Sequence, residues 1–272
     1  HVRASIPELG LVIGERDAEL DGEATLILTA GVDRPPLWSH ETPNLVRVLL
    51  EITSGGETTC QSFRFGFRKV EIRGNRLFLN NQPLKIRGVN RHDYDPDTGW
   101  TLSEARYKQD VALMKRHNIN AIRTSHYPND PRLYDFCDEW GILVMDENDL
   151  ESHGARSKLP ASDPRWTQAC LERMRRMVLR DRNHPCVIIW SLGNEAGIGS
   201  NFAAMRREAE KLDKTRPFHY EGEVNPDSSD FISRMYPDQA LFEKLCAKQP
   251  ARFGVNVGAP NTRYLEIKQE YY

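Results

Sequence analysis

The 272-residue sequence predicts two structural classes in succession, a small antiparallel β-sandwich followed by a (β/α) barrel that looks incomplete. Three observations support this prediction. Short alternating apolar runs fill the first 73 residues, strand-like and helix-like runs alternate after residue 84, and polar residues follow each expected barrel strand. We place the sandwich at residues 1–80, the barrel at 81–250 and a post-barrel segment at 251–272.

The first region reads as β-structure because its apolar residues alternate with polar ones and its runs end at Gly, Pro, Asn or Asp. A hairpin-like link at residues 74–90 then leads into the barrel. The expected strands of the sandwich include residues 24–32 (ATLILTAGV), 44–55 (NLVRVLLEITSG) and 61–72 (QSFRFGFRKVEI).

The second region alternates between strand and helix, which predicts a parallel sheet with crossover helices. Asp163 followed by Pro164 is a helix-start signal, an N-cap with proline in the first turn, whereas Ser103 lacks the glutamate three residues later that completes a capping box. The six expected steps are 84–90 then 103–118, 119–126 then 130–141, 142–148 then 163–183, 186–195 then 200–213, 218–223, and 230–236 then 238–248.

Six strands cannot close an eight-stranded barrel. From residue 84 the chain offers 272 − 83 = 189 residues, whereas a typical barrel has about 250. An open sheet edge exposes unpaired backbone groups, so either the missing strands lie outside these 272 residues or the chain associates with a partner, for which we expect a homo-oligomer.

Composition excludes several classes of partner. Lys and Arg total 37 and Asp and Glu total 39, so a net charge of −2 gives no electrostatic reason to bind nucleic acid or an anionic membrane. The five cysteines have no metal-binding spacing, which favours free thiols and a cytoplasmic location. No apolar run approaches the roughly 18 residues of a membrane helix.

Polar residues cluster where the expected strands end. In a parallel barrel these ends meet at one mouth, so residues far apart in sequence become neighbours. A single polar strand end is as well explained by a loop hydrogen bond or a helix cap, but six together favour an active site. The clusters are Asn90-Arg91-His92, Arg123-Thr124-Ser125-His126, Asp146-Glu147-Asn148, Asn194-Glu195, Glu221 and Met235-Tyr236.

The most informative segment is residues 183–197, NHPCVIIWSLGNEAG, in which an apolar strand ends at Asn194-Glu195. Partial burial and nearby acids can raise the pKa of such a carboxyl group toward that of a general acid. Cleavage of a glycosidic bond needs that acid, together with a second carboxylate at the anomeric carbon. An Asn-Glu pair alone is a weak signal, and Glu195 by itself could equally be a surface carboxylate or part of an ion pair.

Longer strings carry a family resemblance. Residues 87–99 (RGVNRHDYDPDTG), 110–154 and 163–197 resemble the barrel of a family 2 glycoside hydrolase of the β-galactosidase type. The resemblance is specific from about residue 68 to 236 and weaker on either side. It implies an immunoglobulin-like sandwich before a TIM barrel, and a retaining enzyme that hydrolyses terminal β-D-galactose from β-galactosides such as lactose.

The resemblance implies roles for particular residues. Glu195 in GNEAG matches the acid/base, and Asn194 matches its sugar-contacting neighbour. Glu151 and His153 in LESHG match ligands of an active-site Mg²⁺ to which Glu195 also contributes, with Na⁺ as a second candidate ion. Without the resemblance, a Glu-x-His string is more simply a polar loop.

Four further residues match substrate-binding positions of the family. His92 and His126 match histidines that touch sugar hydroxyls or the transition state, although a lone strand-end histidine is more often structural. Met235 and Tyr236 match a pair whose phenol lies near the nucleophile, and core packing is the simpler explanation of these two.

The match breaks at the nucleophile. The family has a glutamate at the end of the seventh strand, in a string like CEYAHAMGN, and these 272 residues contain no such string. The nucleophile is therefore unassigned. Two alternatives follow, a β-glucuronidase or β-mannosidase of the same family, and an inactive carbohydrate-binding fragment that lacks the nucleophile.

Overall fold

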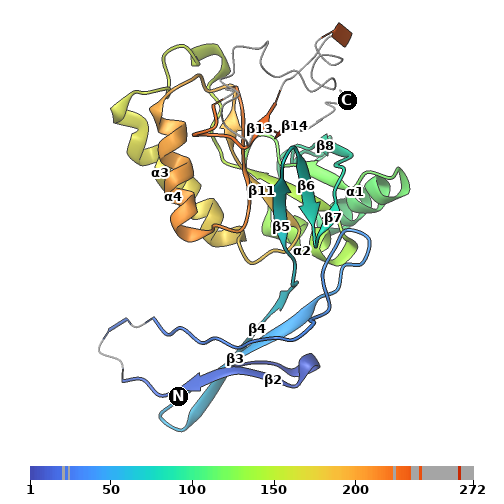
Figure 1. The fold of residues 1–272 in the computed structure, drawn as a ribbon, viewed down its shortest axis with the longest axis vertical. Helices are drawn as coiled ribbons and strands as arrows, with labels where there is room; N and C mark the ends of the chain where they lie inside the picture. Colours follow the sequence, from blue (N-terminus) through green and yellow to red (C-terminus); the bar gives the residue numbers. More distant parts are fainter. Residues whose placement is uncertain (20–21, 24, 223–224, 234–238, 241–262, 265–272) are drawn as a thin grey trace.

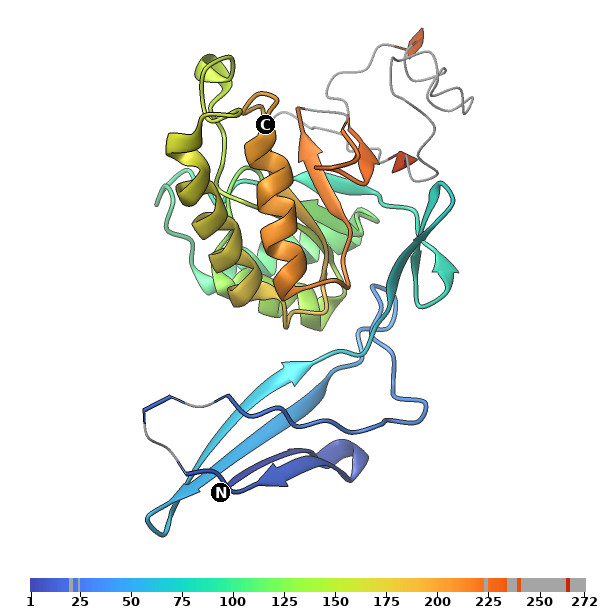
Figure 2. The same ribbon diagram turned by 60° about the vertical axis from the view of Figure 1, so that its left-hand side comes forward.

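The computed structural model describes residues 1–19, 22–23, 25–222, 225–233, 239–240 and 263–264. It has two parts (Figure 1). An antiparallel sheet near the N-terminus lies apart from an α/β body, and the chain passes between them through a narrow connection (Figure 2).

The N-terminal sheet has four strands in the order β2-β1-β3-β4, with antiparallel neighbours. Its core is small, with Ile6, Val46 and Val48 buried and Phe65 and Phe67 packed against them. The two phenylalanine rings meet edge to face, with centroids 5.2 Å apart. The strands are β1 (Val2–Ile6), β2 (Leu11–Arg16), β3 (Val46–Ser54) and β4 (Glu57–Phe65), and a short 3-10 helix η1 (Pro7–Leu9) joins the first two.

The prediction of a strand at residues 24–32 is wrong for the part that the structure describes. Its described part, residues 25–32, forms no strand. Ile27 is 71% exposed, so the alternating pattern is present without a partner strand to bury its apolar face. The four strands within residues 1–65 thus belong to one sheet, and the immunoglobulin-like sandwich stays a prediction.

The expected link at residues 74–90 forms part of a three-stranded antiparallel sheet in the order β5-β6-β7. Val70, Leu77 and Leu79 of this sheet are buried in the core of the α/β body. Trp38 is also in that core, where its indole Nε1 donates to the Asp138 carbonyl at 2.8 Å. The three strands are β5 (Val70–Arg73), β6 (Arg76–Leu79) and β7 (Gln82–Pro83).

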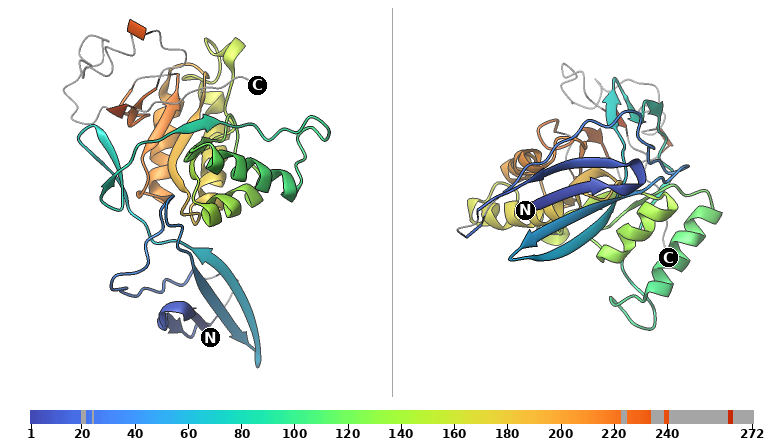
Figure 3. Two further views of the ribbon diagram at one scale, coloured as in Figure 1. Left: turned by 90° about the vertical axis from the view of Figure 1, so that its right-hand side faces the viewer. Right: turned by 90° about the horizontal axis from the view of Figure 1, so that it is seen from below.

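The α/β body contains a parallel sheet in the order β12-β11-β10-β9-β8, which is sequence order, as in one arc of a barrel. The helices lie along one side of this sheet (Figure 3). The central strands are buried on both faces, which explains their nearly continuous apolar sequences. The elements are β8 (Gly88–Asn90), α1 (Glu104–Arg116), β9 (Ala121–Arg123), α2 (Pro131–Trp140), β10 (Leu143–Glu147), α3 (Pro164–Asp181), β11 (Val187–Asn194), α4 (Ser200–Leu212) and β12 (Phe218–Glu221).

Local sequence signals place the helix starts. Asp130 and Asp163 each accept a hydrogen bond from a backbone N–H of the first turn, and each precedes a proline. Ser103 accepts from the Arg106 N–H, and Arg106 supplies no reciprocal carboxylate, as expected for half of a capping box.

The parallel sheet has five strands among the described residues, against six expected strands. The last expected strand appears only as β13 (Phe231–Ile232), which pairs with β14 (Arg263–Tyr264) in a separate two-stranded sheet. Of the helix expected at residues 238–248, only residues 239–240 are described, and both are helical. Most of the segment 251–272 lies outside the described residues. A second 3-10 helix, η2 (His153–Ala155), follows β10.

The outer strands of the described sheet are β8 and β12, so its edges agree with an arc rather than a closed barrel. The domain boundaries and the homo-oligomer stay predictions. Within the part of the chain that the structure describes, no helix is both long and apolar enough to cross a bilayer.

Candidate active site

The carboxyl ends of the parallel strands bring the predicted polar clusters together. Arg123 ends β9, Glu147 ends β10 and Asn194 ends β11, and all three residues are buried. Charged groups at this depth require ionic or hydrogen-bonding partners, because burial without them is costly.

Arg123 and Glu147 form a buried ion pair with each other. The guanidinium donates to both Glu147 carboxylate oxygens, at 2.5 and 2.9 Å, and the two side chains are 2% and 0% exposed. Burial acts to raise the pKa of Glu147, but the Arg123 charge and a hydrogen bond from His126 outweigh it and lower this pKa to about 2. Glu147 is therefore an anion at neutral pH and holds Arg123 in place.

Arg123 also orients the amide of Asn194. Its Nη2 donates to Asn194 Oδ1 at 2.8 Å, and the amide Nδ2 then donates to Glu151 Oε1 at 3.0 Å. The Glu151 loop is further tied to β11 because the Asn194 N–H donates to the Leu150 carbonyl at 2.9 Å. Asn194 thus links the buried ion pair to the loop that carries Glu151.

Glu195 is the first residue beyond β11. It has a φ of 42°, an uncommon conformation for a residue with a side chain, and its N–H donates to the Glu221 carbonyl at 2.7 Å. Two flanking glycines allow this bend, since a Cβ on Gly193 would lie 2.5 Å from the Leu150 oxygen and one on Gly197 would lie 2.1 Å from the Arg156 oxygen. The Glu195 side chain keeps 21% exposure, so it can reach solvent or a ligand.

Glu151, His153 and Glu195 form a group in which one ligand atom from each lies within 4.8 Å of the other two. Two carboxylate oxygens and one imidazole nitrogen suit a hard divalent cation that keeps several waters, so these residues fit Mg²⁺. A protein cation already lies beside them, because Arg156 Nη1 donates to Glu195 Oε1 at 2.8 Å. His153 Nε2 is 3.8 Å from the same oxygen.

His92 and His126 stand side by side, with their rings edge to face and centroids 5.7 Å apart. His126 Nδ1 lies 2.6 Å from Glu147 Oε1. Burial and the neighbouring His126 lower the pKa of His92, which favours its neutral form. The structure therefore brings together Glu195, its neighbour Asn194, the Glu151–His153 pair and both histidines, while Met235 and Tyr236 lie outside the described residues.

Two polar residues inside the strands were missed by the sequence reasoning. Ser191 Oγ lies 2.6 Å from Glu147 Oε2, to which it donates, and 2.8 Å from His219 Nδ1. His219 is fully buried, which lowers its pKa to about 3 and keeps the ring neutral. A serine and a histidine within otherwise apolar strands were the available signal. Arg156 was also missed, because an exposed loop arginine has no distinguishing pattern.

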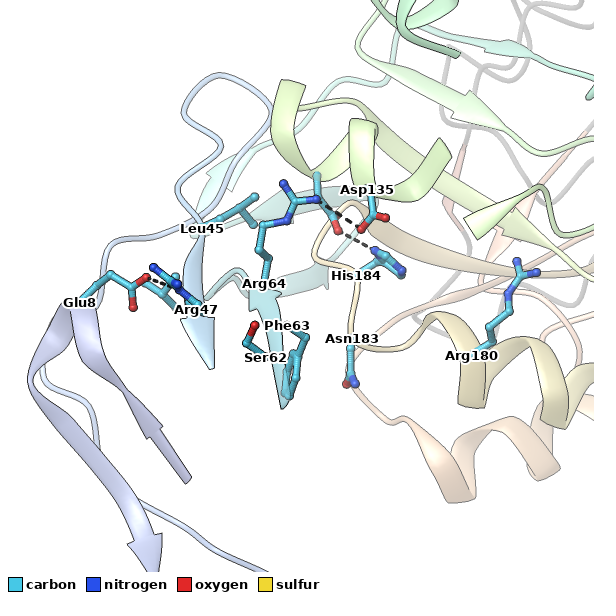
Figure 4. A pocket seen from close by; sticks show the side chains of 12 residues that line it. Glu8, Leu45, Arg47, Ser62, Phe63, Arg64, Asp135, Arg180, Asn183 and His184 are labelled. Carbon is cyan, nitrogen blue, oxygen red and sulfur yellow. Dashed lines mark hydrogen bonds and ion pairs between the residues drawn. The ribbon is translucent and has the colours of Figure 1, made fainter. Parts of the chain in front are cut away.

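A cavity of about 780 Å³ lies elsewhere, between the N-terminal sheet and the turn that precedes β11 (Figure 4). Asp138 accepts there from the Cys186 N–H at 2.9 Å, and its other oxygen lies 2.6 Å from His184 Nδ1. Burial acts to lower the pKa of His184, but the hydrogen bond and charge of Asp138 outweigh it and raise this pKa. The Asp138–His184–Cys186 group is therefore explained by an ion pair between Asp138 and His184 and by the hydrogen bond from the Cys186 backbone, at the junction of the two parts.

Comparison with known families and structures identifies relatives of this arrangement. A family model described as "Glycosyl hydrolases family 2, TIM barrel domain" matches residues 70–259. A β-galactosidase from Vibrio cholerae serotype O1 is 50% identical over 207 residues, and one from Pectobacterium atrosepticum is 48% identical over 213 residues. These alignments cover 74% and 77% of this chain. The chain spans 20% of the length of each of these relatives.

Solved structures share the fold across the chain. A β-glucuronidase from Ruminococcus gnavus is 26% identical with a TM-score of 0.74, and the alignment covers 98% of this chain and 48% of that one. A β-glycosidase from Bacteroides vulgatus is 30% identical with a TM-score of 0.62, covering 75% of this chain and 27% of that one.

Proposed function

Because this chain belongs to the glycosyl hydrolases of family 2, we propose that it carries the acid/base half of a retaining β-galactosidase site, with Glu195 as the proton donor. The position of Glu195 carries this proposal. It is a partly exposed carboxyl group at a strand end, next in sequence to the buried amide of Asn194, and its Oε1 lies 3.8 Å from His153 Nε2. The β-galactosidases that are 48–50% identical to this chain support galactose over glucuronic acid as the sugar.

The residues around Glu195 divide the work of binding and proton transfer. Glu195 protonates the leaving glycosidic oxygen and then, as a base, activates the water that releases the sugar. Asn194 presents its amide to a sugar hydroxyl, in an orientation set by Arg123 and Glu151. His92 and His126 contact other hydroxyls. A residue that is held rigidly contributes more to the transition state than one that must first reorient.

Glu151, His153 and Glu195 are proposed to hold Mg²⁺. When bound, the ion would supply positive charge beside Glu195 and order its waters toward the sugar. Met235 and Tyr236 are proposed on the resemblance alone to contact the substrate.

Arg156 competes with a cation for Glu195, so its removal should tighten Mg²⁺ binding. We expect Arg156→Ala to lower the dissociation constant of Mg²⁺ about fivefold, because it removes one positive charge close to the ion. Titration calorimetry of the full chain measures this. Arg165→Ala is the matched control, since that arginine is exposed and pairs with Asp163 instead. Equal affinities in all three proteins would contradict the competition.

The proposed function is tested by turnover of two aryl glycosides in the presence of Mg²⁺. In a protein that combines this chain with the nucleophile, we expect kcat/KM for an aryl β-galactoside to exceed that for the matching β-glucuronide by about 100-fold, and a chelator to lower the galactoside rate. The reverse preference would instead assign a β-glucuronidase. Galactose binding without turnover of either substrate would instead support the alternative of an inactive carbohydrate-binding fragment. The nucleophile string that these 272 residues lack is the feature that supports this alternative.

A further inference from the structure

The backbone that carries Glu195 is tied to strand β12. This strand pairs with the end of β11, and the register of the pairing shifts between Ser191 and Asn194. The Glu195 N–H donates to the Glu221 carbonyl at 2.7 Å, just beyond the last paired residues. Tyr220 is the residue of β12 that lies opposite the irregular stretch.

The Tyr220 hydroxyl holds the two residues that follow Glu195. It accepts from the Ala196 N–H at 3.1 Å and donates to the Gly197 carbonyl at 2.7 Å. One phenol thus serves as acceptor and donor for adjacent residues, and it closes the turn after β11. The φ of 42° at Glu195 is uncommon for a residue with a side chain, so surrounding contacts are needed to hold it.

The Tyr220 ring is itself fixed in place. It is fully buried and stacks on the Phe202 ring of α4, with centroids 4.1 Å apart and planes 22° from parallel. Gly222 leaves room for the hydroxyl, because a Cβ there would lie 3.0 Å from the phenol oxygen. Since the ring has one position, loss of the hydroxyl oxygen alone would loosen the turn and leave the ring where it is.

We propose that Tyr220 is a positioning residue for the acid/base, which acts through the backbone of residues 195–197. This inference rests on the proposed function. Glu195 can protonate the leaving oxygen only from hydrogen-bonding distance, and a misplacement of about 1 Å can cost about 100-fold in rate. Arg156 and His153 lie beside its carboxylate, but their side chains are 53% and 65% exposed, so they can follow a displaced carboxylate and do not fix it.

The test compares two substrates in a protein that combines this chain with the nucleophile. For a retaining enzyme kcat/KM reports the first step, which needs a proton from Glu195 when the substrate is lactose and little protonation when it is an activated aryl galactoside. We expect Tyr220→Phe to lower the ratio of the lactose value to the aryl value about tenfold. A smaller folded fraction lowers both values equally and leaves this ratio unchanged.

Tyr134→Phe is the matched control. Tyr134 is also fully buried, and its hydroxyl likewise accepts from a backbone N–H, that of Asn129 at 3.0 Å, and donates, to Asp146 at 2.6 Å. The two variants lose comparable hydrogen bonds, so their urea unfolding midpoints should fall by similar amounts. Only Tyr220→Phe should change the substrate ratio.

A second variant removes the support of the ring and keeps the hydroxyl. Phe202→Leu should lower the ratio in the same direction by a smaller factor. An unchanged ratio in Tyr220→Phe, or an equal fall in Tyr134→Phe, would overturn the positioning role. Were Tyr220→Phe not to fold, an unchanged ratio in Phe202→Leu would overturn it.

The same assay separates this inference from the proposed function. Glu195→Gln removes the proton donor itself, so it should lower the substrate ratio further than Tyr220→Phe does. A ratio that falls in Glu195→Gln and not in Tyr220→Phe would reject the positioning role while the proposed function stands. A ratio that Glu195→Gln leaves unchanged would reject both.

Discussion

Replacing Glu147 by glutamine should lower the free energy of unfolding by about 3–5 kcal/mol, the usual cost of leaving a buried charge without its partner. Arg123 would keep its charge with 2% exposure and lose the carboxylate that accepts two of its hydrogen bonds. Urea unfolding at pH 7, followed by tryptophan fluorescence, measures the effect. Trp190 reports on this region because it is fully buried in β11.

Acid provides an internal check on that result. The pKa of Glu147 is lowered to about 2 in the folded chain from an ordinary 4.5, so its contribution to stability is complete above about pH 4.5. That contribution is lost as the pH falls toward 2, so the gap between wild type and variant should narrow over this range. Glu172→Gln removes the ion pair between Glu172 and Arg176 on the surface of α3, and it should leave the unfolding midpoint nearly unchanged. Equal loss in both variants would contradict the role given to Glu147.

The second large effect concerns activity. In a protein that combines this chain with the nucleophile, Glu195→Gln should lower turnover of an unactivated galactoside such as lactose by about 10²–10⁴-fold, because glutamine cannot donate the proton to the leaving oxygen. An activated aryl galactoside should lose much less in its first step, since its leaving group needs little protonation. Arg206→Lys, which alters an ion pair on α4, is a control. Undiminished lactose turnover in Glu195→Gln would refute the assignment.

The arrangement of strands and helices could be predicted because its signals are local. The apolar run at residues 186–195 became β11, and Asp163-Pro164 became the start of α3. The alternation of such segments is enough to predict a parallel sheet and the clustering of its carboxyl ends.

The grouping of Glu151, His153 and Glu195 could be expected only from the family resemblance. Periodicity alone does not show that a loop after β10 lies beside the end of β11. The structure brings the three within 4.8 Å, while their roles stay predictions.

Other features could not be read from the sequence, because they depend on neighbours that are distant along the chain. Residues 25–32 alternate as a strand would, yet no partner strand pairs with them in the described residues. Ser191 looks like an ordinary break in an apolar strand until Glu147 and His219 lie on either side of its hydroxyl. Arg156 gains significance only through its contact with Glu195.

The measurement that tests the central claim most directly is made on Glu195→Gln in a protein that also supplies the nucleophile. It is the anomeric configuration of the product formed from an activated aryl β-galactoside and azide. Azide needs no general base, so it should restore turnover and yield β-galactosyl azide by attack on a covalent galactosyl intermediate. That product is the result expected if Glu195 is the acid/base. An α-galactosyl azide would make Glu195 the nucleophile instead, and turnover that azide does not change would contradict the assignment.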